Sequence, residues 1–362
     1  MDDELLSPQD LLDLQVLWYL FQFSPDYVQG EYAAFFDDPT GYGAPLQTDT
    51  GLMDLFTQGR DYTPADLAYV IDQQHAHMAN VLPMYSQLAA AGQVELTTTP
   101  YYHPIMPLLM MPGWTFEDGI RVNKDAWPVD VGGHLSTGMD LFEAELGFRP
   151  TGMWPSEQAV SPPMVQPVAD VGVEWMVSDE EILAKSTTPG GGGIDVEDAA
   201  LLATPWVVSG DQGGDVAVIF RDRVISDRVA FQYGSMTPEA AVSDFLSYLD
   251  GIRAELLEAG EDPSEHLLTV AMDGENWMFM SEFQHHDNAR PFIHEWYSRL
   301  ASHPTVVTTT PGEFLADDPD WPRIETIGTG SWIDGTHSTW AGEADESLAW
   351  QRLVEARRAL VA

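Results

Sequence analysis

The chain has 362 residues and a formal net charge of -43, from 58 acidic and 15 basic side chains. No basic patch is present to neutralise phosphates, which excludes nucleic acid and anionic membrane surfaces as partners. The 44% of hydrophobic and 11% of aromatic residues still predict a folded protein with a buried core. We attribute the acidity to a salt-rich cytosol, because molar salt screens the repulsion between carboxylates.

The absence of cysteine excludes disulfides, thiolate catalysis and cysteine-bound zinc. The chain starts with acidic residues and has no apolar run long enough for a membrane span, so we expect a cytoplasmic protein. We expect no metal and no cofactor. His75 and His77 are two residues apart, so they would not share a helix face as joint ligands.

Helix and strand patterns alternate along the chain. Helices are expected at residues 1–30, 63–92, 133–146, 237–259, 291–300 and 345–360. Strands are expected at residues 94–98, 151–154, 174–177, 216–220 and 267–272. Because the strands are unbroken apolar runs separated by helices, we predict an α/β fold with a parallel sheet that helices cover.

Polar and aromatic residues follow four of these strands. In chain order they are Tyr101, Tyr102 and His103, then Glu157, then Asp179 and Glu180, and finally Asp273 and Glu275. The carboxyl ends of parallel strands lie at one edge of a sheet, where ligands bind. We therefore expect these residues to meet on one face.

Two carboxylates on either side of a sugar can cleave a glycosidic bond, and Glu157 and Asp273 fit that arrangement. His103 could donate a hydrogen bond to a sugar hydroxyl. Plainer interpretations stay open, since Glu157 could be a helix cap or a solvated carboxylate, and Asp273 with Gly274 could form a turn. Aromatic faces that suit pyranose rings lie near the two acids, at Tyr101, Tyr102, Trp154 and Trp277.

Four short motifs occur in a fixed order, at residues 92–104, 153–157, 272–277 and 310–315. Together they resemble the sequence regions of glycoside hydrolase family 57, which includes α-amylases, amylopullulanases and 4-α-glucanotransferases. Residues 330–335, which contain Trp332, and residues 340–342 resemble a further stretch near the catalytic face in one branch of that family. The resemblance extends along almost the whole chain.

The resemblance implies a retaining glycoside hydrolase that acts on α-glucan with α-1,4 linkages. Glu157 would be the nucleophile and Asp273 the acid/base, with their carboxyl groups about 5 to 5.5 Å apart. Hydrolysis or transfer as a 4-α-glucanotransferase, and α-1,4 or α-1,6 preference, stay open. The residues implied to bind substrate are Tyr101, Tyr102, His103, Trp154, Glu275, Trp277 and Trp332.

The chain departs from the family at its start, where the His-Gln-Pro motif of the first strand is missing. The family barrel has seven strands, whereas Asp273 here follows the fifth expected strand. We therefore expect an incomplete (β/α)7 barrel at residues 1–316, lacking its first two strands, and a C-terminal extension with a closing helix at residues 317–362. A separate chain or an upstream segment would supply the missing strands, and we expect weak activity without them.

Two other classes of function are considered. A non-catalytic glucan-binding or subunit chain would keep the motifs without a complete site. A metal-dependent carbohydrate deacetylase would use a similar incomplete barrel, but its His-x-x-x-His ligand pattern does not occur in this sequence.

Overall fold

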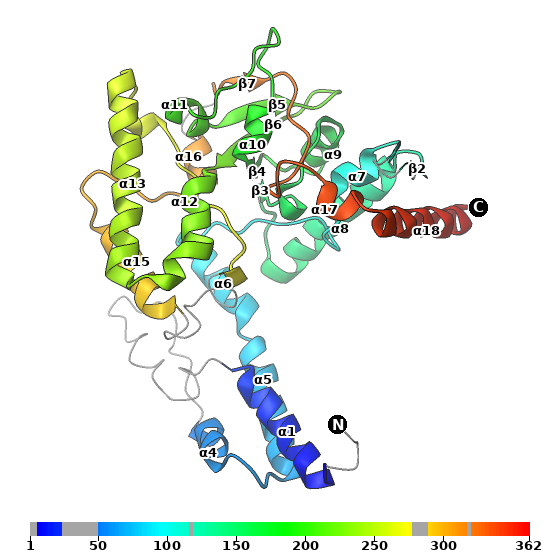
Figure 1. Ribbon diagram of the computed structural model, residues 1–362, viewed down its shortest axis with the longest axis vertical. Coiled ribbons are helices and arrows are strands. Elements are labelled where there is room, and N and C mark those ends of the chain that lie inside the picture. The colour runs from blue at the N-terminus through cyan, green and yellow to red at the C-terminus, as the bar shows by residue number, and fades with distance from the viewer. Residues whose placement is uncertain (1–5, 24–49, 116–118, 120, 277–288, 317–319) are drawn as a thin grey trace. The chain divides into compact units, whose positions relative to one another are not determined.

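The computed structural model describes residues 6–23, 50–115, 119, 121–276, 289–316 and 320–362 (Figure 1). The chain divides into two compact units, residues 1–94 with 282–291 and residues 95–281 with 292–362. The boundary expected at residue 316 stays a prediction. Within the described ranges, no helix combines the length and apolarity needed to cross a membrane.

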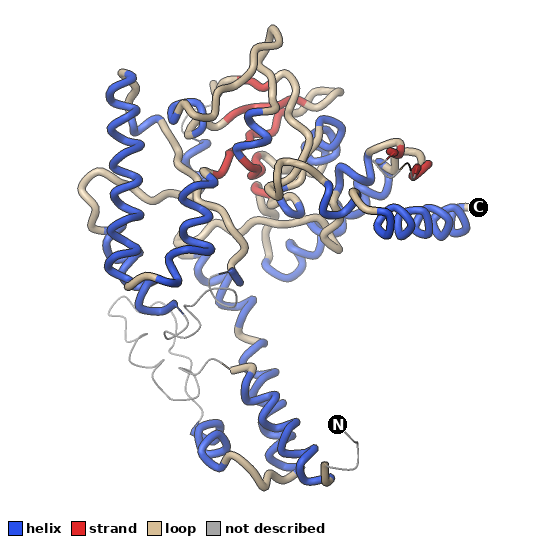
Figure 2. The backbone as a smooth tube through the Cα atoms, in the orientation of Figure 1, coloured by secondary structure: helices blue, strands red, loops and turns tan. Residues whose placement is uncertain are grey.

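The described part of the first unit is helical (Figure 2). Its helices are α1 (Pro8–Phe21), α4 (Thr50–Gln58), α5 (Pro64–Met78) and α6 (Val81–Ala90). Ser7 caps α1 and Thr63 caps α5, each in a capping box with an aspartate three residues on. The helix expected at residues 63–92, with a break at Pro83, is interrupted earlier, at residues 79–80. The core of this unit consists of Val16, Leu20, Phe23, Leu52, Leu55, Tyr62 and Val70.

The second unit contains a five-stranded sheet with the strand order β3-β4-β6-β5-β7. Its strands are β3 (Gly152–Met153), β4 (Trp175–Asp179), β5 (Trp206–Ser209), β6 (Asp215–Arg221) and β7 (Arg323–Ile324). The neighbouring strands β3, β4 and β6 are parallel, as predicted. The pattern does not predict β5, which is antiparallel to β6 because a short turn with positive φ at Gly213 and Gly214 joins the two as a hairpin.

Five parallel segments lie side by side in chain order. Thr98 forms a parallel bridge with Met153 of β3, and Thr269 forms one with Arg221 of β6. The strands expected at residues 94–98 and 267–272 are thus reduced to single bridges, but they occupy the expected places beside β3 and β6. Glu157 follows the second segment and Asp273 the fifth. The supply of further strands by another chain stays a prediction.

The two faces of the sheet bury different sets of side chains. One face packs Met153, Met176, Val218 and Phe220 against the helices of the large core. The other face carries a smaller cluster of Trp175, Val177, Ile219 and Ala271, which Trp154 and Leu315 also join. Because both faces are covered, all five residues of β4 are buried, and its first three, Trp175 to Val177, are apolar.

Helices and short strands surround the sheet, with α12 and α13 on one side of it and α8 and α9 on the other (Figure 1). Val354 of the last helix belongs to the large core. The short elements are α7 (Met106–Met110), β1 (Gly113–Thr115), β2 (Arg121–Asn123), α9 (Val165–Asp170), α10 (Glu180–Ala184), α11 (Ala199–Leu202), α12 (Arg223–Asp227), α16 (Pro311–Ala316) and α17 (Ser338–Ala341). The long helices are α8 (Pro128–Leu146), α13 (Pro238–Ala259), α15 (Arg290–Ala301) and α18 (Ala344–Val361).

Helix α8 supports the loop that follows the first parallel segment. The backbone N–H of Tyr101 donates to the carbonyl of His134 at 3.0 Å. One turn further along α8, a Cβ on Gly138 would lie 2.8 Å from the carbonyl oxygen of Thr99 and 3.2 Å from the nitrogen of Tyr101. Glycine at position 138 therefore lets the loop of residues 99–103 approach the helix closely.

We predict that Gly138→Ala lowers the free energy of unfolding by about 1–3 kcal/mol, because the new methyl group overlaps backbone atoms that cannot move alone. The same change at the exposed Gly133 of α8 meets nothing within 4 Å. Gly133→Ala should therefore stabilise the chain by up to about 1 kcal/mol. Denaturant titration in concentrated KCl measures both values. Equal stability of the two variants would contradict the close approach at position 138.

Candidate active site

The backbone around Glu157 is held in an unusual conformation. Glu157 lies in a 3-10 turn (Ser156–Gln158) after β3, and it adopts φ 54° and ψ 29°. Gln158 also has a positive φ of 51°. Left-handed conformations cost a non-glycine residue roughly 1–2 kcal/mol, and they persist at functional sites when the surroundings enforce them.

A distant segment, residues 330–332, provides that enforcement. Val160 donates to the carbonyl of Gly330 at 2.8 Å and accepts from the Gly330 nitrogen at 3.1 Å, so the two residues form an antiparallel bridge. The backbone nitrogen of Trp332 also donates to the carbonyl of Glu157 at 3.3 Å. The strained turn is thus fixed by main-chain hydrogen bonds to a segment near the C-terminus.

The carboxylate of Glu157 has two different neighbours. Trp332 Nε1 donates to its Oε2 at 2.8 Å. His103 Nε2 lies 3.9 Å from its Oε1, which is too long for a hydrogen bond but close enough for attraction when the histidine is protonated. The side chain of Glu157 is 29% exposed, so a ligand in solution can reach the carboxylate.

Asp273 has the environment of a proton donor. Partial burial raises its pKa above the ordinary value, and the negative charges of Glu275 and Glu157 raise it further. The positive charges of His103 and Arg221 oppose this rise. Because Glu157 acts on the pKa of Asp273, the two carboxyl groups lie within electrostatic range of each other. Two carboxyls with such different surroundings suit an acid and a nucleophile.

Both acids line one cleft with a volume of about 370 Å³. The shallow opening brings together residues from the ends of β3, β6 and the fifth parallel segment, together with the loop of residues 332–334. Its lining residues are Glu157, Arg221, Arg223, Asp227, Ala230, Phe231, Met272, Asp273, Asn276, Trp332, Ile333 and Asp334.

Three more of the residues expected from the sequence have clear positions. Trp154 meets Trp332 edge to face, with ring centroids 5.3 Å apart, so both indoles are beside the nucleophile candidate. Tyr101 and Tyr102 contact each other, with ring centroids 4.3 Å apart, but neither lines the cleft. Tyr102 is 81% exposed.

Two other expected binding residues, Glu275 and Trp277, are not placed in the cleft by the structure. Glu275 is exposed and does not line the cleft, although its charge acts on Asp273. Trp277 lies outside the described residues, so its place in the site stays a prediction. Of the expected site residues, Glu157, Asp273 and Trp332 line the cleft, whereas Tyr101, Tyr102 and Glu275 do not.

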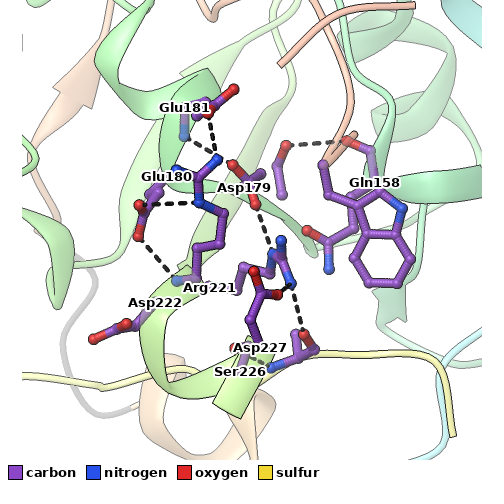
Figure 3. Close-up of polar contacts among 12 residues, drawn as sticks. Gln158, Asp179, Glu180, Glu181, Arg221, Asp222, Ser226 and Asp227 are labelled. Atoms are coloured by element: carbon purple, nitrogen blue, oxygen red, sulfur yellow. Dashed lines mark hydrogen bonds and ion pairs between the residues drawn. The ribbon is translucent and has the colours of Figure 1, made fainter. Parts of the chain in front are cut away.

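The structure adds a residue that the pattern does not select. Arg221, at the end of β6, lies between Asp179 and Asp227 and lines the cleft (Figure 3). Asp179 is fully buried beneath the cleft, and Glu180 accepts from the backbone nitrogen of Arg223 at 2.9 Å. Both are therefore part of the support for the site and do not line it. The signal for Arg221 is its place one residue beyond a predicted strand, at the edge where the acids gather.

Within the described ranges, no group of three or more histidine, aspartate or glutamate side chains could hold a metal ion. The cleft itself offers the carboxyl groups of Glu157 and Asp273 and the indole of Trp332, and His103 lies beside it, 3.9 Å from Glu157.

A sequence profile described as glycosyl hydrolase family 57 matches residues 4–325. The chain belongs to glycosyl hydrolase family 57. A search of curated protein sequences finds no significant match. The matched range contains Glu157, Asp273 and the parallel segments that precede them.

Solved family 57 structures share the fold at low sequence identity. A branching enzyme from Thermococcus kodakaraensis aligns with a TM-score of 0.62 and 14% identity, over 96% of this chain and 65% of that chain. An α-amylase from Thermotoga maritima gives 0.56 and 12%, over 91% and 66%. A 4-α-glucanotransferase from Thermococcus litoralis gives 0.54 and 17%, over 80% and 38%. The chain therefore spans between 38% and 66% of the length of these structures.

We predict that Asp273→Asn makes this family 57 chain more stable at neutral pH. Folding raises the pKa of Asp273, so the folded chain binds this proton more tightly than the unfolded chain does. The resulting stabilisation is complete below the unfolded pKa of about 3.9. It is lost as the pH rises through the folded pKa. The variant should have the higher unfolding midpoint at pH 7, and the difference should shrink towards pH 4.

The matched control for this experiment is Asp262→Asn. Hydrogen bonds from Ser264 lower the pKa of Asp262, so the same change there should not stabilise the chain at pH 7. Thermal unfolding at the lowest KCl concentration that keeps the chain folded measures both effects. A lower unfolding midpoint for Asp273→Asn at pH 7 would contradict the conclusion that ionised Asp273 is unfavourable in the folded chain.

Proposed function

We propose that this chain is a retaining glycoside hydrolase that cleaves α-1,4 linkages in α-glucan. The observation that carries the proposal is the pairing, in one cleft of a family 57 chain, of Glu157 with an Asp273 whose pKa is raised. Differences in environment of this kind separate a nucleophile from a general acid. The structural neighbours support the substrate class, since they are an α-amylase, a branching enzyme and a 4-α-glucanotransferase.

In the first step, a carboxylate oxygen of Glu157 attacks C1 of the sugar on the cleaved side. The bond between C1 and the glycosidic oxygen breaks as an ester bond between C1 and Glu157 forms. Asp273 transfers its proton to the departing oxygen, which leaves as a free hydroxyl group. The raised pKa of Asp273 increases the fraction of enzyme that is ready for this transfer.

In the second step, a water molecule attacks C1 and the ester bond to Glu157 breaks. Asp273, now ionised, takes the proton of that water and returns to its starting state. The reaction needs two carboxyl groups and water, and no cofactor. Attack by a sugar hydroxyl in place of water would give transfer through the same ester.

The groups around the acids have defined roles in the proposal. Trp154 and Trp332 offer indole faces for the apolar side of a pyranose ring, and His103 donates to a sugar hydroxyl next to Glu157. We also propose that the five parallel segments correspond to five consecutive strands of a (β/α)7 barrel. Tyr101, Tyr102, Glu275 and Trp277 remain predicted binding residues.

We predict that Glu157→Gln abolishes fluoride release from α-maltotriosyl fluoride, because the amide cannot attack C1. Fluoride leaves without a proton, so this donor tests the nucleophile separately from Asp273. The loss should reach at least about 10³-fold, within the range that positioned groups contribute to catalysis. A 5-fluoro glycosyl fluoride, which traps the ester, should label the peptide that contains Glu157 in mass spectrometry.

The matched control is Glu174→Gln, which changes an exposed glutamate outside the cleft. Its rate should equal that of the unaltered chain. Turnover by Glu157→Gln, or a label on another carboxylate, would refute the proposed roles. Glucan binding with neither fluoride release nor labelling would favour the non-catalytic alternative.

A pH dependence follows from the charge of Glu275. Because this charge raises the pKa of Asp273, Glu275→Gln should lower that pKa. Asp273 must be protonated for the first step, so the fall of kcat/KM at high pH should begin at a lower pH in the variant. Hydrolysis of maltoheptaose measured across pH tests this shift.

The control for the pH experiment is Glu265→Gln, which removes the same charge from an exposed position that does not act on Asp273. Its profile should overlay that of the unaltered chain. A shift of the same size in both variants would assign the effect to net charge and remove the specific role of Glu275.

A further inference from the structure

Three elements hold the guanidinium of Arg221 in one orientation (Figure 3). Its Nε donates to Asp179 Oδ2 at 2.6 Å, and its Nη1 donates to Asp227 Oδ1 at 3.1 Å. The same Nη1 lies 3.5 Å from the carbonyl oxygen of Ala271. These partners come from β4, α12 and the fifth parallel segment, so Arg221 connects the elements that end around the cleft.

Stability alone does not explain a buried ion pair at this place. The side chains of Arg221 and Asp179 are 7% and 0% exposed. Removing two charges from water costs several kcal/mol for each ion, and apolar residues of similar volume often give equal or greater stability. A function for the guanidinium should therefore be sought in what it contacts on the side of the cleft.

That contact is the indole of Trp332. The guanidinium carbon of Arg221 lies 5.1 Å from the centre of the Trp332 ring. A cation at this distance is attracted to the negative face of the ring, and so resists rotation of the ring. The ring of Trp154 packs against the same indole at an interplanar angle of 82°. Trp332 is thus held in one plane by a charged and an aromatic neighbour.

The orientation of Trp332 decides the position of the Glu157 carboxylate. An indole has a single N–H donor, and the donor of Trp332 points at Glu157 Oε2, 2.8 Å away. A cation over the ring also withdraws electron density from it, which strengthens the N–H as a donor. Oε2 is therefore occupied, whereas Oε1 has His103 at 3.9 Å and no closer charged partner among the described residues.

We propose that Arg221 is a positioning residue for Glu157 and acts through the indole of Trp332. The ordered row of Asp179, Arg221 and Trp332 fixes Oε2, so that Oε1 is the oxygen that attacks C1. This inference rests on the proposed function, because it assigns the attacking atom within that mechanism. Arg221 itself forms no bond with the reacting atoms.

The test uses fluoride release from α-maltotriosyl fluoride, which reports attack by Glu157 without a proton donor. Arg221→Met and Trp332→Phe should each lower kcat about 10- to 100-fold, the range expected for a misplaced reacting group. KM should change little in Arg221→Met, because Arg221 is given no contact with the substrate. The double variant should be no slower than Trp332→Phe alone, because both residues act along one path. Arg221→Lys should recover part of the rate, since it keeps a cation near the ring.

Two further variants keep the test decisive. Arg149→Met changes a half-exposed arginine that pairs with Asp140 and Glu143 outside the cleft, and it should leave kcat unchanged. If Arg221→Met does not fold because Asp179 loses its partner, Asp179→Asn with Arg221→Met removes both buried charges. This charge-free pair should fold and still show the low kcat.

The inference is overturned if the effects of Arg221→Met and Trp332→Phe multiply in the double variant. It is also overturned if Arg221→Met changes KM alone, or if Arg221→Lys is no faster than Arg221→Met. Mass spectrometry separates this failure from failure of the proposed function. A label on Glu157 that forms in Arg221→Met at the rate of the unaltered chain refutes only the role of Arg221, whereas absence of any label on Glu157 refutes the proposed function.

Discussion

The site depends on a short main-chain pairing between the turn that contains Glu157 and the segment at residues 330–332. Glu157 and Gln158 both adopt left-handed conformations, which are unfavourable for residues with side chains. The antiparallel bridge between Val160 and Gly330, together with the backbone bond from Trp332, compensates for that strain. The same segment carries the indole that meets the carboxylate, so backbone geometry and side-chain chemistry are fixed together.

Charge is distributed unevenly between the surface and the site. The chain as a whole is strongly acidic, yet Arg221 and Arg223 line the cleft and each is paired with carboxylates. These pairs are partly or fully buried, so dissolved salt screens them much less than it screens exposed charges. High salt can therefore relieve repulsion over the surface while the ion pairs of Arg221 and Arg223 change little.

Patterns within short stretches of sequence predict the features that depend on neighbouring residues, such as strands and the residues that follow them. The apolar runs identify the parallel segments, and the rule that functional groups gather at their carboxyl ends selects Glu157 and Asp273. The hairpin of β5 and β6 is not predicted from the sequence. Strand β5 has only four residues, and its place is set by its pairing with β6 and β7. The contact of Trp332 with Glu157 joins residues 175 positions apart, and no periodicity indicates such a contact. Arg221 is missed for a related reason, since its place beside a strand does not reveal its buried partner Asp179, 42 positions away.

The long separation between Glu157 and Trp332 also has a consequence for biosynthesis. At translation rates of about 5–20 residues per second, Glu157 would leave the ribosome roughly 9 to 35 seconds before the indole that orients it. The sheet residues that precede Glu157 would be available during this interval, but the strained turn would lack the segment of residues 330–332 that stabilises it. The competent geometry of the carboxylate is thus a late product of folding, formed only when the C-terminal segment docks.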